Sequence, residues 1–176
     1  MTQYNFLGKN QPIDYLHMIN SAYLIEEIKK KVAIGLNLLF AKDSFLLQNV
    51  VHERSTAHKF AEYLQILFPD WNVDFEYNKD IDENGADSKR EPGIRSDSHT
   101  DRIVPDIIIH KRGTHEHLLV IEIKKVGGKE ILDIKKLIEF TSPSGKHKYI
   151  LGLFIEFHST EKPTQRWFEN GNETNH

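Results

Sequence analysis

The chain has 176 residues, of which 39% are hydrophobic and 28% are charged, a composition that fits one globular domain and excludes a collagen-like, coiled-coil or fully disordered chain. The sequence contains no cysteine, which excludes disulfides, thiol catalysis and thiolate metal sites and fits a reducing compartment. The net charge of −3 argues against a protein that coats nucleic acid without specificity, but not against an enzyme that holds it through a local patch.

The sequence contains neither a membrane-spanning segment nor a secretory signal. No stretch approaches the roughly 18 consecutive apolar residues that a membrane span requires. The first residues also lack a basic region followed by an apolar run. We therefore expect a soluble, cytoplasmic protein with a single domain over residues 1–176.

Two helices are predicted in the first 70 residues. Residues 1–18 contain a glycine and a proline, which indicate an irregular lead-in. Apolar residues then recur at spacings of three and four over 20–40, which predicts a helix within an N-terminal helical extension over 1–48. The lysines at 29–31 should lie on its solvated face. The second helix ends before Pro69, and it has three candidate N-caps: Asp43, Ser44 and Asn49.

Short apolar runs and apolar–polar alternation predict four strands, at 71–77, 103–110, 118–125 and 149–157. A helix over 129–140 lies between the last two. The order α-α-β-β-β-α-β predicts an α/β or α+β domain with a mixed sheet flanked by helices. The polar tail from residue 159 onward has no predicted element.

The segment 79–101 differs from the rest of the chain because it has only three apolar residues, Ile81, Ala86 and Ile94. Such a segment cannot bury enough surface to offset its ordering entropy. We expect a mobile loop, and loops of this length are often functional.

Several common site motifs are absent from the sequence. There is no G-x-x-x-x-G-K-[ST] phosphate-binding loop and no H-E-x-x-H zinc motif. The tight cluster His115-Glu116-His117 lies in a predicted turn, so we interpret it as a solvated tip rather than a metal site.

A cluster of charged residues is predicted within the strands at 103–125. Glu122 and Lys124 are two residues apart on one strand, so their side chains share a face. If the residue numbers of paired residues on the two strands sum to 228, Asp106 lies directly opposite Glu122, with the two side chains roughly 5 Å apart. Lys124 is then a diagonal neighbour of Asp106. An odd sum would place the two carboxylates on opposite faces.

Burying these charges is costly unless they pair with one another or hold a cation. Carboxylate oxygens suit Mg²⁺ or Mn²⁺, which prefer phosphate as a further ligand. Lys124 could then orient or deprotonate an attacking water, or neutralise charge in a phosphoryl transition state.

Glu53 has two interpretations. It extends the apolar stripe of the second helix, formed by Ala57, Phe60, Ala61 and Leu64, which indicates an inward-facing acid. Alternatively, Glu53 is a favourable negative charge in the first turn of a helix capped by Asn49.

These residues carry a resemblance to a known superfamily. Pro105-Asp106, followed by Glu122-Ile123-Lys124 sixteen residues after the aspartate, resembles the PD-(D/E)XK nucleases, which have the restriction-endonuclease-like fold. The helix that contains His52-Glu53-Arg54-Ser55 resembles the one that supplies a further acid in many members. The resemblance covers roughly 49–157, and the order α-β-β-β-α-β is that of the superfamily core.

The resemblance implies a Mg²⁺- or Mn²⁺-dependent endonuclease that hydrolyses DNA phosphodiester bonds in bacterial restriction, defence or repair. It implies Asp106 and Glu122 as metal ligands, Lys124 as the catalytic lysine, and Glu53 as a further metal-binding or water-holding acid. A polar residue of the following helix often contributes; the candidates here are Asp133, Lys135 and Lys136. In the loop, the expected phosphate contacts are Lys79, Lys89, Arg90, Arg95 and Arg102.

Two other functions compete with this interpretation. One is a catalytically silent binding or regulatory module that kept the fold, and the acidic composition without a separate DNA-binding domain favours this module, or a partner protein or second copy that supplies the contacts. The other is a structural ion pair between Lys124 and either Glu122 or Asp106. The intact set of Asp106, Glu122 and Lys124 argues against a degenerate copy, because buried charges are costly to keep.

Overall fold

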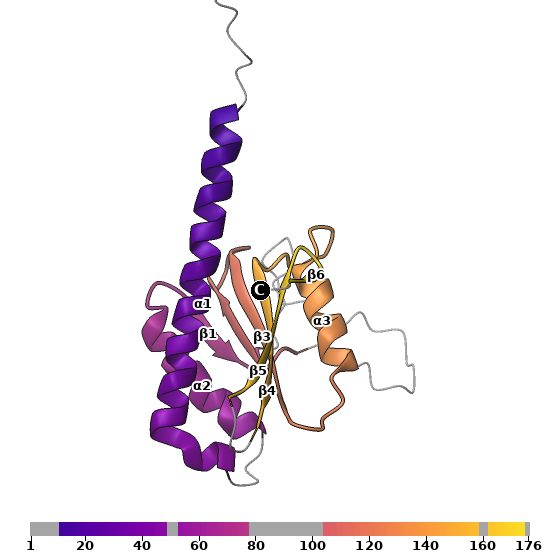
Figure 1. Cartoon of the computed structure of the whole chain (residues 1–176). Helices are drawn as coiled ribbons and strands as arrows, with labels where there is room; N and C mark the ends of the chain where they lie inside the picture. Colours follow the sequence, from indigo (N-terminus) through magenta and orange to yellow (C-terminus); the bar gives the residue numbers. More distant parts are fainter. Residues whose placement is uncertain (1–10, 49–52, 78–103, 159–161, 175–176) are drawn as a thin grey trace, which may run out of the picture.

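The computed structural model describes residues 11–48, 53–77, 104–158 and 162–174, which form a six-stranded sheet with helices on both faces (Figure 1). The elements in chain order are α1 (Gln11–Gln48), α2 (Glu53–Leu67), β1 (Asn72–Phe75), β2 (Ile107–His110), β3 (His117–Lys125), α3 (Ile131–Thr141), β4 (Leu151–Phe157), β5 (Thr164–Glu169) and β6 (Asn172–Thr174).

The strands lie side by side in chain order from β1 to β6. Every neighbouring pair is antiparallel except β3 and β4, which are parallel. A parallel pair needs a crossover connection, and α3 provides it. The mixed sheet between helices confirms the predicted fold class, that of the restriction-endonuclease-like core.

The two faces of the sheet carry separate apolar clusters because side chains alternate along each strand. Helices α1 and α2 cover one face, where they pack on Ile107, Ile109, Leu119, Ile121, Ile123, Leu153 and Ile155. Helix α3 covers the other face, where Leu137 and Phe140 pack with Ile108, Val120, Phe154 and Phe168. Figure 1 shows this arrangement, with α1 and α2 on one side of the strands and α3 on the other.

Helix α1 starts at Gln11, earlier than predicted. The prediction of an irregular lead-in is therefore wrong for residues 11–18. Pro12 is compatible with this start, because the N–H groups in the first turn of a helix have no intrahelical partner. The N-terminal part of α1 extends beyond the sheet (Figure 1). Near its other end, Asp43 has non-helical backbone angles and interrupts the helix.

Helix α2 begins at Glu53, so Asp43 and Ser44, which lie in α1, are not its caps. The third candidate, Asn49, lies outside the described residues. The buried face of α2 is the predicted stripe, with Thr56 in addition to Ala57, Phe60, Ala61 and Leu64.

The C-terminal hairpin of β5 and β6 was not predicted. Its strands are held by buried Trp167 and Phe168, on opposite faces of the sheet, and are joined by a tight turn. Asn170 and Gly171 have positive φ angles of 51° and 76°. An Asn-Gly pair is a strong hairpin signal because both positions of a type I′ turn need positive φ.

Two charged segments differ from their predictions. In the lysine triplet only Lys30 is exposed, whereas Lys29 lies over Trp167 and Lys31 over Phe68, at 5.6 and 5.0 Å from the ring centres. The tip at 115–117 is also only partly solvated, because His117 begins β3 and stacks on Tyr149.

The predicted mobile loop at 79–101 lies outside the described residues. Strand β2 is shorter than predicted, since its pairing starts at Ile107 rather than at 103. None of the helices in the described part of the chain is both long enough and apolar enough to cross a membrane.

Candidate active site

The register of β2 and β3 brings Asp106 to Glu122. Partner numbers sum to 228 from Ile107, which faces Ile121, to Ile109, which faces Leu119. Asp106 directly precedes Ile107, the first residue of β2 that pairs with β3. Its backbone carbonyl accepts a hydrogen bond from the amide of Glu76 at 3.0 Å, and its Oδ2 accepts one from the amide of Ile123 at 2.7 Å. Asp106 is therefore fixed between β1 and β3.

Glu122 is the most unusual group of the cluster because its carboxylate is almost fully buried, at 1% exposure. Oε2 lies 3.3 Å from the Lys136 ammonium, and Oε1 has no hydrogen-bond partner among the described residues. Burial and the neighbouring charge of Asp106 raise the pKa of Glu122 to about 9. Burial also raises the pKa of Asp106, although the Ile123 amide and the lysines partly offset it.

Lys124 shares the sheet face of Glu122, but its ion pairs are with other acids. Its Nζ lies 3.3 Å from Asp133 Oδ2 and 3.8 Å from Glu53 Oε2. Burial by itself lowers the pKa of Lys124, but the surrounding carboxylates outweigh it and raise the pKa above 10.5. The ammonium is therefore charged at neutral pH. Within the described chain, the predicted structural pair of Lys124 with Glu122 or Asp106 is not the pairing found.

Glu53 lies at the partly exposed end of the inner stripe of α2, with its side chain 39% exposed, and the predicted cap Asn49 lies outside the described residues. Glu53 is the first residue of α2, where a negative charge is favourable, and its side chain also faces the end of β3. Oε1 accepts a hydrogen bond of 3.0 Å from the amide of Lys125, and Oε2 is the oxygen near Lys124. Glu53 thus holds the end of the strand that carries the catalytic lysine candidate.

Helix α3 contributes two of its three candidate residues. Asp133 is buried and lies between the two lysines of the site, with Oδ1 3.2 Å from Lys136 Nζ and Oδ2 near Lys124. Lys135 is exposed. The spacing of Asp133 from Leu137, Phe140 and Thr141, the other buried residues of α3, could have identified it as inward-facing.

The family comparison matches the part of the chain that carries this cluster. The model of the archaeal Holliday junction resolvase (Hjc) family matches residues 72–160, half of the chain. The chain belongs to this family. The Hjc family is part of the PD-(D/E)XK nuclease superfamily, so the predicted resemblance is confirmed.

The Hjc match covers β1 to β4 and α3, and with them Asp106, Glu122, Lys124, Asp133 and Lys136. Helices α1 and α2, with Glu53, and the hairpin β5–β6 lie outside it. No curated protein and no solved structure matches the chain significantly.

The donor groups fit a small divalent cation. A buried carboxylate oxygen without a partner, on Glu122, is costly unless a water or cation contacts it. Mg²⁺ is commonly held by one or two carboxylates and keeps several waters. In the described segments no three acidic or histidine side chains converge as a metal-binding group, so Glu53 does not complete a three-carboxylate site there. The fit is to the pair Asp106 and Glu122.

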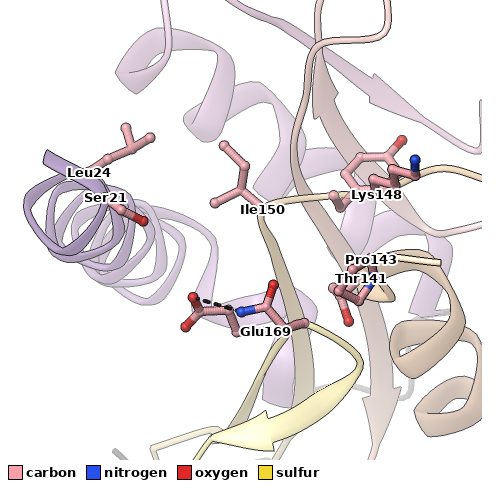
Figure 2. Close-up of a pocket in the computed structure, with 9 residues that line it drawn as sticks. Ser21, Leu24, Thr141, Pro143, Lys148, Ile150 and Glu169 are labelled. Carbon is pink, nitrogen blue, oxygen red and sulfur yellow. Dashed lines mark hydrogen bonds between the residues drawn. The ribbon is translucent and has the colours of Figure 1, made fainter. Parts of the chain in front are cut away.

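A pocket of about 500 Å³ lies away from this cluster, between α1, the end of α3 and the start of β4. Figure 2 shows Ser21 and Leu24 of α1 across from Ile150 and Glu169. No residue of the charged cluster lines it, so the pocket is not part of the candidate active site.

The basic residues proposed to contact phosphate lie outside the described residues. This holds for Lys79, Lys89, Arg90, Arg95 and Arg102. Their role in nucleic-acid binding stays a prediction.

Proposed function

We propose that this protein is a divalent-metal-dependent endonuclease that hydrolyses phosphodiester bonds in branched DNA. The observation that carries the proposal is the buried carboxylate of Glu122, with one oxygen unpartnered in the described chain, beside Asp106 and on the sheet face of Lys124. The match to a family of junction resolvases supports DNA as the substrate, and a branched form of it in particular.

Asp106 and Glu122 would hold Mg²⁺ or Mn²⁺. When bound, the cation would polarise a phosphoryl oxygen and lower the pKa of a coordinated water. Within the chain, Asp106 offers a carboxylate that the Ile123 amide holds in one orientation. Glu122 offers an oxygen that no other group in the described chain occupies.

Lys124 is assigned the role of a charged donor. Because its pKa is raised rather than lowered, Lys124 stays protonated at neutral pH and has no lone pair with which to accept a proton. It can instead donate hydrogen bonds to the attacking water or to phosphoryl oxygens as negative charge develops. Asp133 and Glu53 fix the direction in which it does so.

Resolution of a four-way junction requires cuts in two strands. The described part of the chain carries one cluster of this kind, so we propose that two copies act on one junction, which is itself close to two-fold symmetric. Because junctions arise in DNA repair, the family match favours repair over restriction or defence as the setting.

The experiment compares cleavage of a labelled four-way junction with cleavage of a linear duplex of the same arm sequence, in Mg²⁺, Mn²⁺ and EDTA. We expect the junction to be cut only with a divalent cation and in preference to the duplex. Lys124→Met should reduce the rate by about 100-fold or more. Glu139→Gln, an exposed change on α3, is the matched control and should cut like the wild type.

Two results would overturn the proposal. If the wild-type protein binds the junction but does not cut it in either Mg²⁺ or Mn²⁺, the protein is a catalytically silent binding module. Cleavage that continues in EDTA, and at the same rate in Lys124→Met, places the activity elsewhere.

A further inference from the structure

The Lys136 ammonium lies between two buried carboxylates. Its Nζ is 3.3 Å from Glu122 Oε2 and 3.2 Å from Asp133 Oδ1. Asp133, at 4% exposure, uses its other oxygen for Lys124. Acidic and basic side chains therefore alternate in the order Glu122, Lys136, Asp133 and Lys124. The first and last of them lie on β3, and the two between them lie on α3.

This contact places Lys136 in competition with a metal ion. Lys136 occupies one oxygen of the carboxylate that would hold the cation. An ammonium at that distance repels any further positive charge brought to Glu122, whether or not a proton leaves at the same time, because a divalent cation always adds net positive charge. The low exposure of Glu122 strengthens this repulsion, since buried charges are poorly screened.

Lys136 is also able to withdraw. Its side chain lies in the middle of α3 and is about one quarter exposed, so the ammonium can reach solvent while its aliphatic stem stays on the helix surface. Asp133 would remain as its partner, because Lys136 already contacts it one helical turn away.

We propose that the Lys136 ammonium occupies the carboxyl group of Glu122 until a divalent cation displaces it, so that Lys136 sets the metal affinity of the site. Asp133 receives the displaced ammonium and acts as a positioning residue for both lysines. The inference rests on the proposed function, because it takes Asp106 and Glu122 as the metal ligands.

The test is calorimetric titration of the full-length protein with Mn²⁺, without DNA. Lys136→Met should bind Mn²⁺ about tenfold more tightly than the wild type, a size typical of changes next to metal ligands. Asp133→Asn should bind it more weakly, because the site loses a negative charge. Lys135→Met, the same change at the exposed neighbouring position, is the matched control and should bind like the wild type.

The same variants have a second readout in urea unfolding with EDTA. Lys136→Met should lower the midpoint, since the buried carboxylate of Asp133 loses one of its two cations, whereas Lys135→Met should not. If Lys136→Met does not fold, Lys136→Gln removes the charge but keeps a polar group with two donor hydrogens, and it should also tighten Mn²⁺ binding.

The outcomes separate this inference from the proposed function. Equal or weaker Mn²⁺ binding by Lys136→Met or Lys136→Gln, with normal binding by the wild type, overturns the proposed role of Lys136 alone. A wild-type protein that binds no Mn²⁺ overturns both. A purely structural role for Lys136 predicts a lower urea midpoint without tighter Mn²⁺ binding.

Discussion

The backbone amide of Ile123 donates a hydrogen bond of 2.7 Å to Oδ2 of Asp106. The aspartate precedes β2, so its side chain continues the pairing with β3 at a point where the backbone ladder has not yet begun. One residue thus closes the end of the β2–β3 pairing and presents a carboxylate to Glu122.

Two substitutions of Asp106 separate these tasks. Asp106→Asn keeps an oxygen that can accept from Ile123 and removes the charge, so in EDTA the variant should be at least as stable as the wild type. Asp106→Ala leaves the Ile123 amide unpaired and should be about 1–3 kcal/mol less stable than Asp106→Asn. Urea unfolding at pH 8 measures both, and equal stability of the two variants would show that the hydrogen bond contributes nothing.

Glu122 predicts a pH dependence of stability in the metal-free protein. Its pKa is about 9 in the folded chain, against an ordinary value of 4.5, because of burial and the charge of Asp106. A group with a raised pKa contributes stability that is fully present below the unfolded pKa and is lost as the pH rises towards the folded one. Stability should therefore fall between pH 5 and 9.

Glu122→Gln removes this dependence because glutamine has no proton to lose. In EDTA at pH 8 it should be about 2–4 kcal/mol more stable than the wild type, and at pH 4 the difference should shrink. The measurement is urea unfolding at both pH values. A structural role for the Lys136–Glu122 pair makes the opposite prediction, namely that Glu122→Gln is destabilised at pH 8.

The contacts of Asp74 lead us to expect that the protein loses stability at acidic pH, independently of cleavage. Burial by itself would raise its pKa, but the Arg112 guanidinium and the contact with His110 outweigh burial and hold the pKa below 3.8. His110 Nε2 lies 2.8 Å from Oδ2 of Asp74, and Arg112 pairs with both carboxylate oxygens. This contribution is present above pH 4 and is lost as the pH falls through the lowered pKa.

Asp74→Asn should lower the free energy of unfolding by about 1–3 kcal/mol at pH 7. The difference from the wild type should be smaller at pH 2–3, where protonation of Asp74 has already broken its ion pair with Arg112 in the wild type. Its rate of junction cleavage should stay near that of the wild type at a temperature where both are folded. A loss of cleavage without a loss of stability would instead connect the β1–β2 contact to the active site.

Trp167 tests whether the hairpin outside the family match belongs to the same folding unit. Its indole is buried on the face covered by α1, beneath Lys29. Trp167→Ala should cost about 3–5 kcal/mol and keep a single cooperative unfolding transition. Circular dichroism and tryptophan fluorescence from the remaining Trp71 should then report the same midpoint. Separate midpoints would contradict the prediction of one domain over 1–176.

Strands β1 to β4 and the charged cluster on them could be predicted from the sequence because both depend on local periodicity. The parity of Glu122 and Lys124 follows from the two-residue repeat of a strand, and one register between neighbouring strands then determines where Asp106 lies. The buried stripe of α2 could be predicted from the helical repeat for the same kind of reason, and Glu53 lies at its partly exposed end.

The partners of Lys124 and Lys136 could not be predicted in this way. They depend on how α3 crosses from β3 to β4, a tertiary relationship that no short repeat encodes, and Asp133 therefore stood as one of three equal candidates. The hairpin of β5 and β6 is not predicted for another reason, since its buried side chains are two adjacent aromatics in a polar segment. The feature that indicates it is the turn at Asn170-Gly171.

Asp106 and Glu122 are proposed to form a divalent-cation site together. Calorimetric titration of Mn²⁺ into the wild type, Asp106→Asn and Glu122→Gln tests it most directly, with Glu139→Gln as control. We expect the wild type and the control to bind Mn²⁺, and each of the other two variants to lose at least tenfold in affinity. Undiminished Mn²⁺ binding by both Asp106→Asn and Glu122→Gln would contradict the proposal.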